Sequence, residues 1–284
     1  SSGETDDFVR SRSTVADAAE TVESGQDAAV AHPVYRVRTV QGKVERRNDA
    51  GLWIPLVSGE LLPANDEIRT DVNSVAVVKL GDSELVLPGE SKVTLEEKEG
   101  LITGLRLNYG RASVRVSAND TIQMRFDGSD SEALASDALF SSQNTGDGYI
   151  TLSSDEGVVE LSAAGESVRI PAGFQSVVAP ERAPSEPRKI PSSFFLKVRR
   201  PSAKTRARKV VVTGTTTPGS VVTIKGVSTH ADASGVFSLT VPLREGDNAL
   251  QVRATDVLGR KGTKALRKIL VDSKAPKVDG DVTW

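Results

Sequence analysis

Apolar and polar residues alternate in short runs along most of this chain, and this pattern constrains its fold more than any other feature. The run at residues 35–40 alternates in this way, and similar runs follow at close intervals up to residue 178. A period of two places successive side chains on opposite faces of a strand, and turn residues such as Gly81-Asp82-Ser83 separate the runs. Short strands at this spacing predict an all-β fold. Within residues 35–178, residues 130–141 are the one stretch for which we expect a helical turn.

A second alternating pattern begins at Lys209 and ends near Asp272, and its length suits a small β-sandwich. Four prolines between residues 179 and 193 indicate a semi-rigid boundary before it, because proline fixes φ and removes a backbone donor. The first 32 residues are polar and acidic, with at most one weak helix. We therefore expect a flexible acidic lead-in at 1–33, a β-rich domain at 34–179, a proline-rich basic linker at 180–208, a β-sandwich at 209–272 and a tail at 273–284.

The residues that most enzymes and metal sites use are scarce. The 284-residue chain has no Cys and only two His, His32 and His230. A Ser–His–Asp triad would need one of these, and we interpret both as surface residues. There is no phosphate-binding Gly-x-x-x-x-Gly-Lys-Ser/Thr loop, and no apolar run approaches the about 18 residues of a transmembrane helix. We expect no enzymatic activity, no cofactor and no metal site.

Three local features admit both a functional and a structural interpretation. Residues 96–99 concentrate carboxylates, but neighbours on a strand point to opposite faces, which favours a solvated turn. The acidic run 127–132 lacks the glycine and glutamate of an EF-hand loop, which leaves only a looser Ca²⁺ site there or near Asp256 and Asp272. Trp53 is either a packing residue or a platform on which a ligand stacks.

The charge of the chain is divided between its two halves. Up to Pro187 there are 17 basic and 31 acidic residues, whereas the remainder has 19 basic and 7 acidic ones. Residues 188–209 hold nine basic residues and no acidic one. The candidate partner-binding residues in and around this stretch are Arg188, Lys189, Phe194, Phe195, Lys197, Arg199, Arg200, Arg206, Arg208 and Lys209.

Two interpretations of this basic stretch are open. It docks to an anionic protein, polymer or membrane surface, with Phe194 and Phe195 inserted into the partner. Alternatively it is a solvated linker whose phenylalanines pack under the first strand of the second domain and whose cations pair with the acidic first domain. Nucleic acid is disfavoured, because the aromatic residues are not interleaved with the charges.

Two sets of motifs resemble known bacterial families. Gly42-Lys43-Val44, Trp53-Ile54-Pro55-Leu56 and Asp66-Glu67-Ile68-Arg69-Thr70-Asp71 are the main matches by which residues 35–178 resemble a FecR-type periplasmic domain. Residues 209–272 resemble a bacterial Ig-like module, through Val212-Thr213-Gly214 and Glu245-Gly246-Asp247-Asn248, among others. The resemblance implies a non-catalytic protein of the periplasm or cell surface.

From these features we expect a non-enzymatic cell-envelope scaffold or adaptor. Its partner is expected to be an envelope protein, peptidoglycan or another anionic polymer, bound in part through exposed strand edges. Two alternatives stay open: the periplasmic sensor part of a transmembrane sigma-factor regulator, and a glycan-binding accessory module. The resemblance associates the sensor with a transmembrane helix and an anti-sigma segment, and neither is visible in this sequence.

Overall fold

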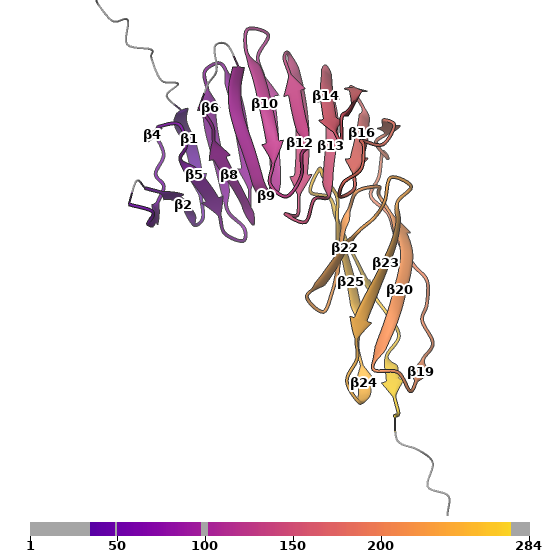
Figure 1. Ribbon diagram of the computed structural model, residues 1–284. Helices are drawn as coiled ribbons and strands as arrows, with labels where there is room; N and C mark the ends of the chain where they lie inside the picture. Colours follow the sequence, from indigo (N-terminus) through magenta and orange to yellow (C-terminus); the bar gives the residue numbers. More distant parts are fainter. Residues whose placement is uncertain (1–34, 49, 98–101, 274–284) are drawn as a thin grey trace, which may run out of the picture. The chain divides into compact units, whose positions relative to one another are not determined.

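The computed structural model describes residues 35–48, 50–97 and 102–273, and Figure 1 shows them as strands joined by turns. The fold is all-β, as predicted. No helix that could cross a membrane occurs in the described part of the chain. The described residues belong to one compact unit. The predicted acidic lead-in and most of the predicted tail lie outside the described residues.

Two groups of strands follow each other along the chain. We call strands β1–β17 the first β region and strands β18–β27 the second β region. The first comprises β1 (Tyr35–Gln41), β2 (Val44–Arg47), β3 (Trp53–Pro55), β4 (Leu61–Leu62), β5 (Glu67–Thr70), β6 (Val75–Leu80), β7 (Ser83–Pro88), β8 (Ser91–Leu95), β9 (Ile102–Val116), β10 (Thr121–Phe126), β11 (Glu132–Ala135), β12 (Ala138–Asn144), β13 (Ile150–Glu156), β14 (Val158–Ala163), β15 (Glu166–Pro171), β16 (Phe174–Val178) and β17 (Arg188–Lys189). The second comprises β18 (Leu196–Val198), β19 (Lys204–Thr205), β20 (Lys209–Thr216), β21 (Val221–Ile224), β22 (Val227–His230), β23 (Val236–Pro242), β24 (Gly246–Asn248), β25 (Gln251–Thr255), β26 (Lys261–Ala265) and β27 (Ile269–Val271).

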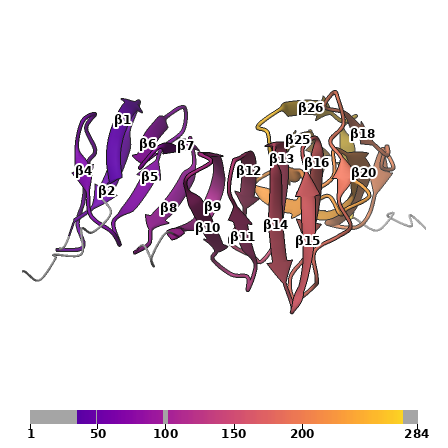
Figure 2. The ribbon, with the colours of Figure 1, turned by 90° about the horizontal axis from the view of Figure 1, so that it is seen from above.

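The first β region consists of two sheets. Sheet A has the order β4-β1-β6-β7-β9-β12-β13-β16-β17. Sheet B has the order β3-β2-β5-β8-β9-β10-β11-β14-β15, and Figure 2 shows the hairpin β14–β15 near its end. Hairpins such as β6–β7 and β10–β11 alternate with pairings between strands further apart in the sequence, such as β1–β6 and β9–β12.

Strand β9 belongs to both sheets and changes sheet at Gly110. Residues 105–109 pair with β8 in sheet B, and residues 110–116 pair with β12 in sheet A. Gly110 has a φ of 89°, a backbone conformation that L-residues with a side chain rarely adopt. After a turn the chain returns to sheet B as β10, which lies parallel to the first half of β9. Strand β9, the turn after it and strand β10 thus connect the two sheets.

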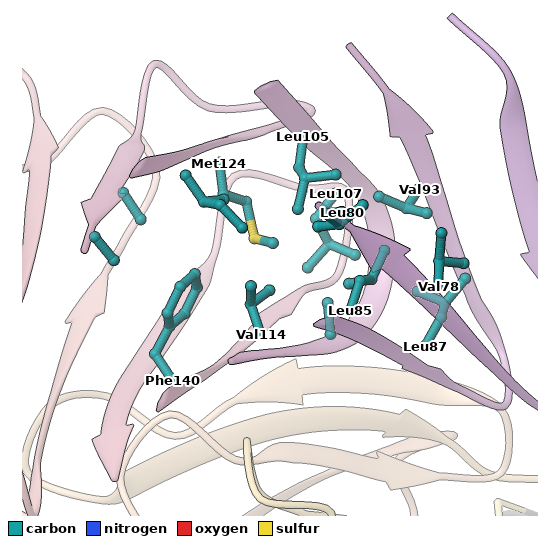
Figure 3. Close-up of a cluster of buried hydrophobic side chains, with 14 of the residues drawn as sticks. Val78, Leu80, Leu85, Leu87, Val93, Leu105, Leu107, Val114, Met124 and Phe140 are labelled. Carbon is teal, nitrogen blue, oxygen red and sulfur yellow. The ribbon is translucent and has the colours of Figure 1, made fainter. Parts of the chain in front are cut away.

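The core of the first β region lies between its sheets and is mainly aliphatic. Strand β6 alternates strictly between buried and half-buried residues, as its sequence pattern predicts. Figure 3 shows Leu85, Val114, Met124 and Phe140 pointing into the same interior from different strands. Each such side chain stabilises the fold by about 1.5–3 kcal/mol relative to leaving it in water.

The helical turn expected at residues 130–141 is not found, and this prediction is wrong. The stretch contains β11 and the beginning of β12. Ala133 and Ala135 are buried with a period of two, and β11 pairs with β10 and β14 on its two sides. The hydrogen bonds of two flanking strands outweigh a weak local preference for helix.

The second β region has its own hydrophobic core, which includes Val212, Phe237 and Val252. Its three sheets have the orders β18-β20-β23, β19-β27-β24 and β22-β21-β25-β26. The stretch predicted as a linker, residues 180–208, contains three short strands. Of these, β17 pairs with β16, β18 with β20, and β19 with β27. Backbone pairing therefore anchors parts of this stretch to the sheets on both sides.

His230 was predicted to be a surface residue, and the structure corrects this. Its side chain is only 6% exposed. The ring stacks on Tyr149 of the first β region with centroids 4.3 Å apart, and its Nε2 lies 2.7 Å from the hydroxyl of Thr145. His32, which was also predicted to be a surface residue, lies outside the described residues. The aromatic stack buries His230 where the two β regions touch.

We expect the buried His230 ring to make stability depend on pH. Burial lowers the pKa of His230 below its usual 6.5, while Asp147 partly opposes the shift. The unfolded chain therefore takes up a proton at a higher pH than the folded chain, so stability is full above about pH 6.5 and falls as the pH falls below it. Urea unfolding between pH 5 and 8 should show a smaller pH dependence for His230→Gln than for the parent protein. Parallel pH profiles of the two proteins would contradict this.

Candidate functional site

The ten candidate partner-binding residues do not form one surface. Arg188 and Lys189 form β17 at the edge of sheet A, whereas Lys197 lies in β18 and Lys209 begins β20. The guanidinium of Arg208 lies 3.9 Å from the carboxylate of Glu245, which is within ion-pair distance. Arg199, Arg200 and Arg206 are exposed. The structure thus distributes the predicted set over both β regions.

The two phenylalanines have different environments. Phe194 packs against the core of the second β region, and its ring lies so close to Gly262 that a Cβ there would overlap it. Phe195 is 36% exposed, and its backbone carbonyl accepts a hydrogen bond from the hydroxyl of Thr216. Phe194 therefore follows the structural interpretation and is not free to insert into a partner.

A groove of about 750 Å³ lies between β18 and β26 and includes two of the predicted residues, Lys197 and Arg200. Its apolar part includes Leu196, Val198 and Leu266, which also pack against the core of the second β region. We call this surface the basic groove. Its lining residues are Leu196, Lys197, Val198, Arg200, Pro201, Ala203, Lys264, Ala265, Leu266 and Arg267.

Both strands beside the basic groove are edge strands within the described structure. Strand β18 pairs only with β20, and β26 pairs only with β25. Just after β18, the amide of Arg199 donates to the carbonyl of Thr213 in β20. Just after β26, the amide of Leu266 donates to the carbonyl of Leu250. Since amides alternate in direction along a strand, those of Val198 and Ala265 point away from the paired strand. Each edge therefore leaves a backbone amide without a backbone partner in the described structure.

The basic groove carries four cations that have no carboxylate within ion-pair distance among the described residues: Lys197, Arg200, Lys264 and Arg267. All four are exposed. Nearby cations differ, because Lys204 pairs with Asp272 and Lys268 with Asp247. Four uncompensated positive charges around one groove attract an anionic ligand and increase its rate of association.

Lys264 and Arg267 were missed by the sequence analysis. They lie more than sixty positions after Lys197, and only the approach of β26 to β18 brings them to the same groove. A sequence signal was nevertheless present, since residues 260–268 contain five basic residues and no acidic one.

The other candidate residues have structural partners. Arg69 stacks over the ring of Trp53, 4.0 Å from its centroid, and covers one face of the proposed platform. Asp256 is buried and accepts a hydrogen bond of 2.7 Å from Arg260. Asp127 accepts a hydrogen bond from Asn108. Within residues 35–48, 50–97 and 102–273, no group of three or more potential metal ligands converges.

Of the carboxylates at residues 96–99, Glu96 is held by cations. Glu96 binds the guanidinium of Arg106, and Arg125 lies 3.6 Å from its second oxygen. Lys98 and Glu99 lie outside the described residues. The structure therefore shows Glu96 in an ion-pair network that links β9 and β10.

Comparison with known proteins gives weak similarities. Two crystal structures of a putative anti-sigma factor from Parabacteroides distasonis ATCC 8503 are similar to this chain, with 16% and 15% sequence identity. Both have a TM-score of 0.38, and the similar part covers 43% of this chain and 59% of those chains. A TM-score this low carries no inference about function. No model of a protein family matches the chain, and no curated protein does.

Proposed function

We propose that this protein is a non-enzymatic adaptor that holds an extended acidic segment of a protein partner in the basic groove. The partner segment adds to an open strand edge at β18 or β26 through main-chain hydrogen bonds. Its acidic side chains contact Lys197, Arg200, Lys264 and Arg267, and its apolar side chains lie against the apolar part of the groove. Alternation of acidic and apolar residues in the partner satisfies both requirements, because side chains of a strand alternate between faces.

One observation carries this proposal: open strand edges and four unpaired cations surround the same groove. Main-chain pairing provides affinity without demanding a particular sequence, and the charges select acidic segments over basic ones. An anionic polymer without amide groups would use only the charges. This favours an acidic protein segment as the partner.

The proposal includes a location in the bacterial periplasm or at the cell surface. It is supported by the motifs that resemble FecR-type and Ig-like modules of envelope proteins, such as Asp66-Glu67-Ile68-Arg69-Thr70-Asp71. No observation in the structure favours the sensor alternative over the adaptor.

A synthetic seven-residue peptide that alternates glutamate and valine tests the proposed partner chemistry by calorimetry. We expect the parent chain to bind it, and the fourfold variant Lys197→Ser, Arg200→Ser, Lys264→Ser, Arg267→Ser to bind at least about tenfold more weakly, since each lost charge contact weakens binding. Binding to the parent should also weaken as salt is added.

A matched control removes the same charge elsewhere, with Arg188→Ser, Lys189→Ser, Arg206→Ser and Lys209→Ser. This variant should bind the peptide as the parent does. Equal losses in the two fourfold variants would mean that net charge alone attracts the peptide, and the site would then not be the basic groove. Undiminished binding by a peptide of the same charge with prolines in place of the valines would contradict strand addition, because proline lacks the amide donor.

A further inference from the structure

A second cleft, of about 740 Å³, lies where β9 and β12 meet β21, β25 and β26. Unlike the basic groove, it is lined mainly by hydroxyl, amide and basic groups, and it contains an aromatic ring. The lining residues that matter for its chemistry are Tyr109, Arg111, Gln143, Thr223, Arg253 and Lys261. Its volume lies in the range of small-molecule sites.

Gln143 gives this cleft a buried acceptor without a partner. The residue is 6% exposed and lines the cleft, and its Oε1 has no hydrogen-bond partner. Buried polar atoms in folded proteins are nearly always paired, so an unpaired one at a cleft points to a missing donor. A hydroxyl or N–H of a ligand would supply that donor.

Arg111 gives the cleft a partly buried cation. Burial lowers the pKa of Arg111, although the charges of Asp256 and Glu90 partly oppose this shift. No carboxylate of the described residues lies within ion-pair distance of its guanidinium. The guanidinium also lies so close to Gly259 that a Cβ there would overlap Nη1. Packing thus holds this cation in place, as recognition of a planar anion requires.

Two exposed cations and one aromatic ring complete the cleft. Arg253 and Lys261 line it from β25 and β26, and Lys261 has no ion-pair partner among the described residues. Tyr109 is 41% exposed and presents its ring at the cleft. Glu90 also lines the cleft and can accept hydrogen bonds from hydroxyl groups.

We propose that this cleft binds a saccharide unit that carries a carboxylate, of the uronic acid type. The carboxylate contacts Arg111 with Arg253 or Lys261, because guanidinium groups bind carboxylates in a matching planar geometry. A sugar hydroxyl donates to Oε1 of Gln143, and the apolar face of the sugar ring lies against Tyr109. A simple inorganic anion would leave the acceptor and the aromatic ring unused.

Calorimetry with the full chain and trigalacturonate tests this site, and the fully methyl-esterified trisaccharide serves as the matched neutral ligand. We expect the parent to bind trigalacturonate and to bind the ester at least about tenfold more weakly. Tyr109→Ala and Arg111→Met should each weaken binding at least about tenfold. The control Arg169→Met removes one exposed cation from β15, outside the cleft, and should bind as the parent does.

Lys261→Met provides a second test on an exposed residue, in case Arg111→Met fails to fold. Absence of binding, equal binding of acid and ester, or parental binding by Tyr109→Ala and by folded cleft-cation variants would overturn the proposal. Loss of binding in the fourfold variant of the basic groove would also overturn it, because the saccharide would then occupy the groove. The two proposals are thus tested separately, since that variant should keep parental affinity for trigalacturonate.

Discussion

Replacing Gly110 by alanine is expected to destabilise the protein by about 2–5 kcal/mol. A Cβ at this position would lie 2.5 Å from the backbone carbonyl oxygen of Glu90, which cannot move without disturbing the turn between β7 and β8. A side chain at positive φ costs roughly 1–2 kcal/mol, and overlap with fixed backbone adds about 1–3 kcal/mol. The midpoint and slope of urea unfolding measure the decrease in the free energy of unfolding.

Gly165 provides the matched control for this substitution. It also has a positive φ, of 77°, but no heavy atom lies within 4 Å of a Cβ built there. Gly165→Ala should therefore cost only about 1–2 kcal/mol, the conformational part alone. Equal losses at the two glycines would mean that the close approach of β9 to the turn at Glu90 does not matter for stability.

Asn144→Asp is expected to lower the free energy of unfolding by about 3 kcal/mol or more at neutral pH. Asn144 is fully buried at the end of β12, and its Nδ2 donates to the carbonyls of Leu107, Asn108 and Asp127 at 2.8–3.1 Å. An aspartate has the same size, but its carboxylate would face these oxygens without a donor. A buried charge with unpaired acceptors costs several kcal/mol in this way.

Two comparisons test the explanation for Asn144. At low pH a protonated aspartic acid can donate one hydrogen bond, so the difference in unfolding free energy from the parent should narrow. Asn119→Asp changes an exposed asparagine in the turn before β10 and should cost less than about 0.5 kcal/mol. A pH-independent deficit for Asn144→Asp would contradict the account.

The alternating patterns were sufficient to predict the fold class, since strands such as β6 bury every second residue. They were not sufficient at residues 130–141, where small residues fit either a helix or a strand and only the pairing of β11 with β10 and β14 decides. Period-two reading does separate two strands at Gly110, because the apolar positions 105, 107 and 109 before it change phase to 112, 114 and 116 after it. It could not show that the two halves of β9 belong to different sheets.

Sequence reasoning found half of the charged part of the basic groove. Lys197 and Arg200 lie in the basic run that drew attention, whereas Lys264 and Arg267 join them only through the approach of two edge strands. The unpaired acceptor of Gln143 could not be foreseen at all, because burial and the absence of a donor are properties of the folded chain. The sequence thus predicted where basic residues are concentrated, but not which of them lie around the same groove.

Amide hydrogen exchange measured by NMR, with and without the alternating glutamate–valine peptide, tests the adaptor proposal most directly. Strand addition pairs backbone amides that otherwise face solvent, so exchange at Val198 in β18 or at Ala265 in β26 should slow when the peptide binds. The amide of Arg169 in β15, another edge strand, also points away from its paired strand, and its exchange should be unaffected. A bound peptide that leaves exchange at both Val198 and Ala265 unchanged would contradict the account.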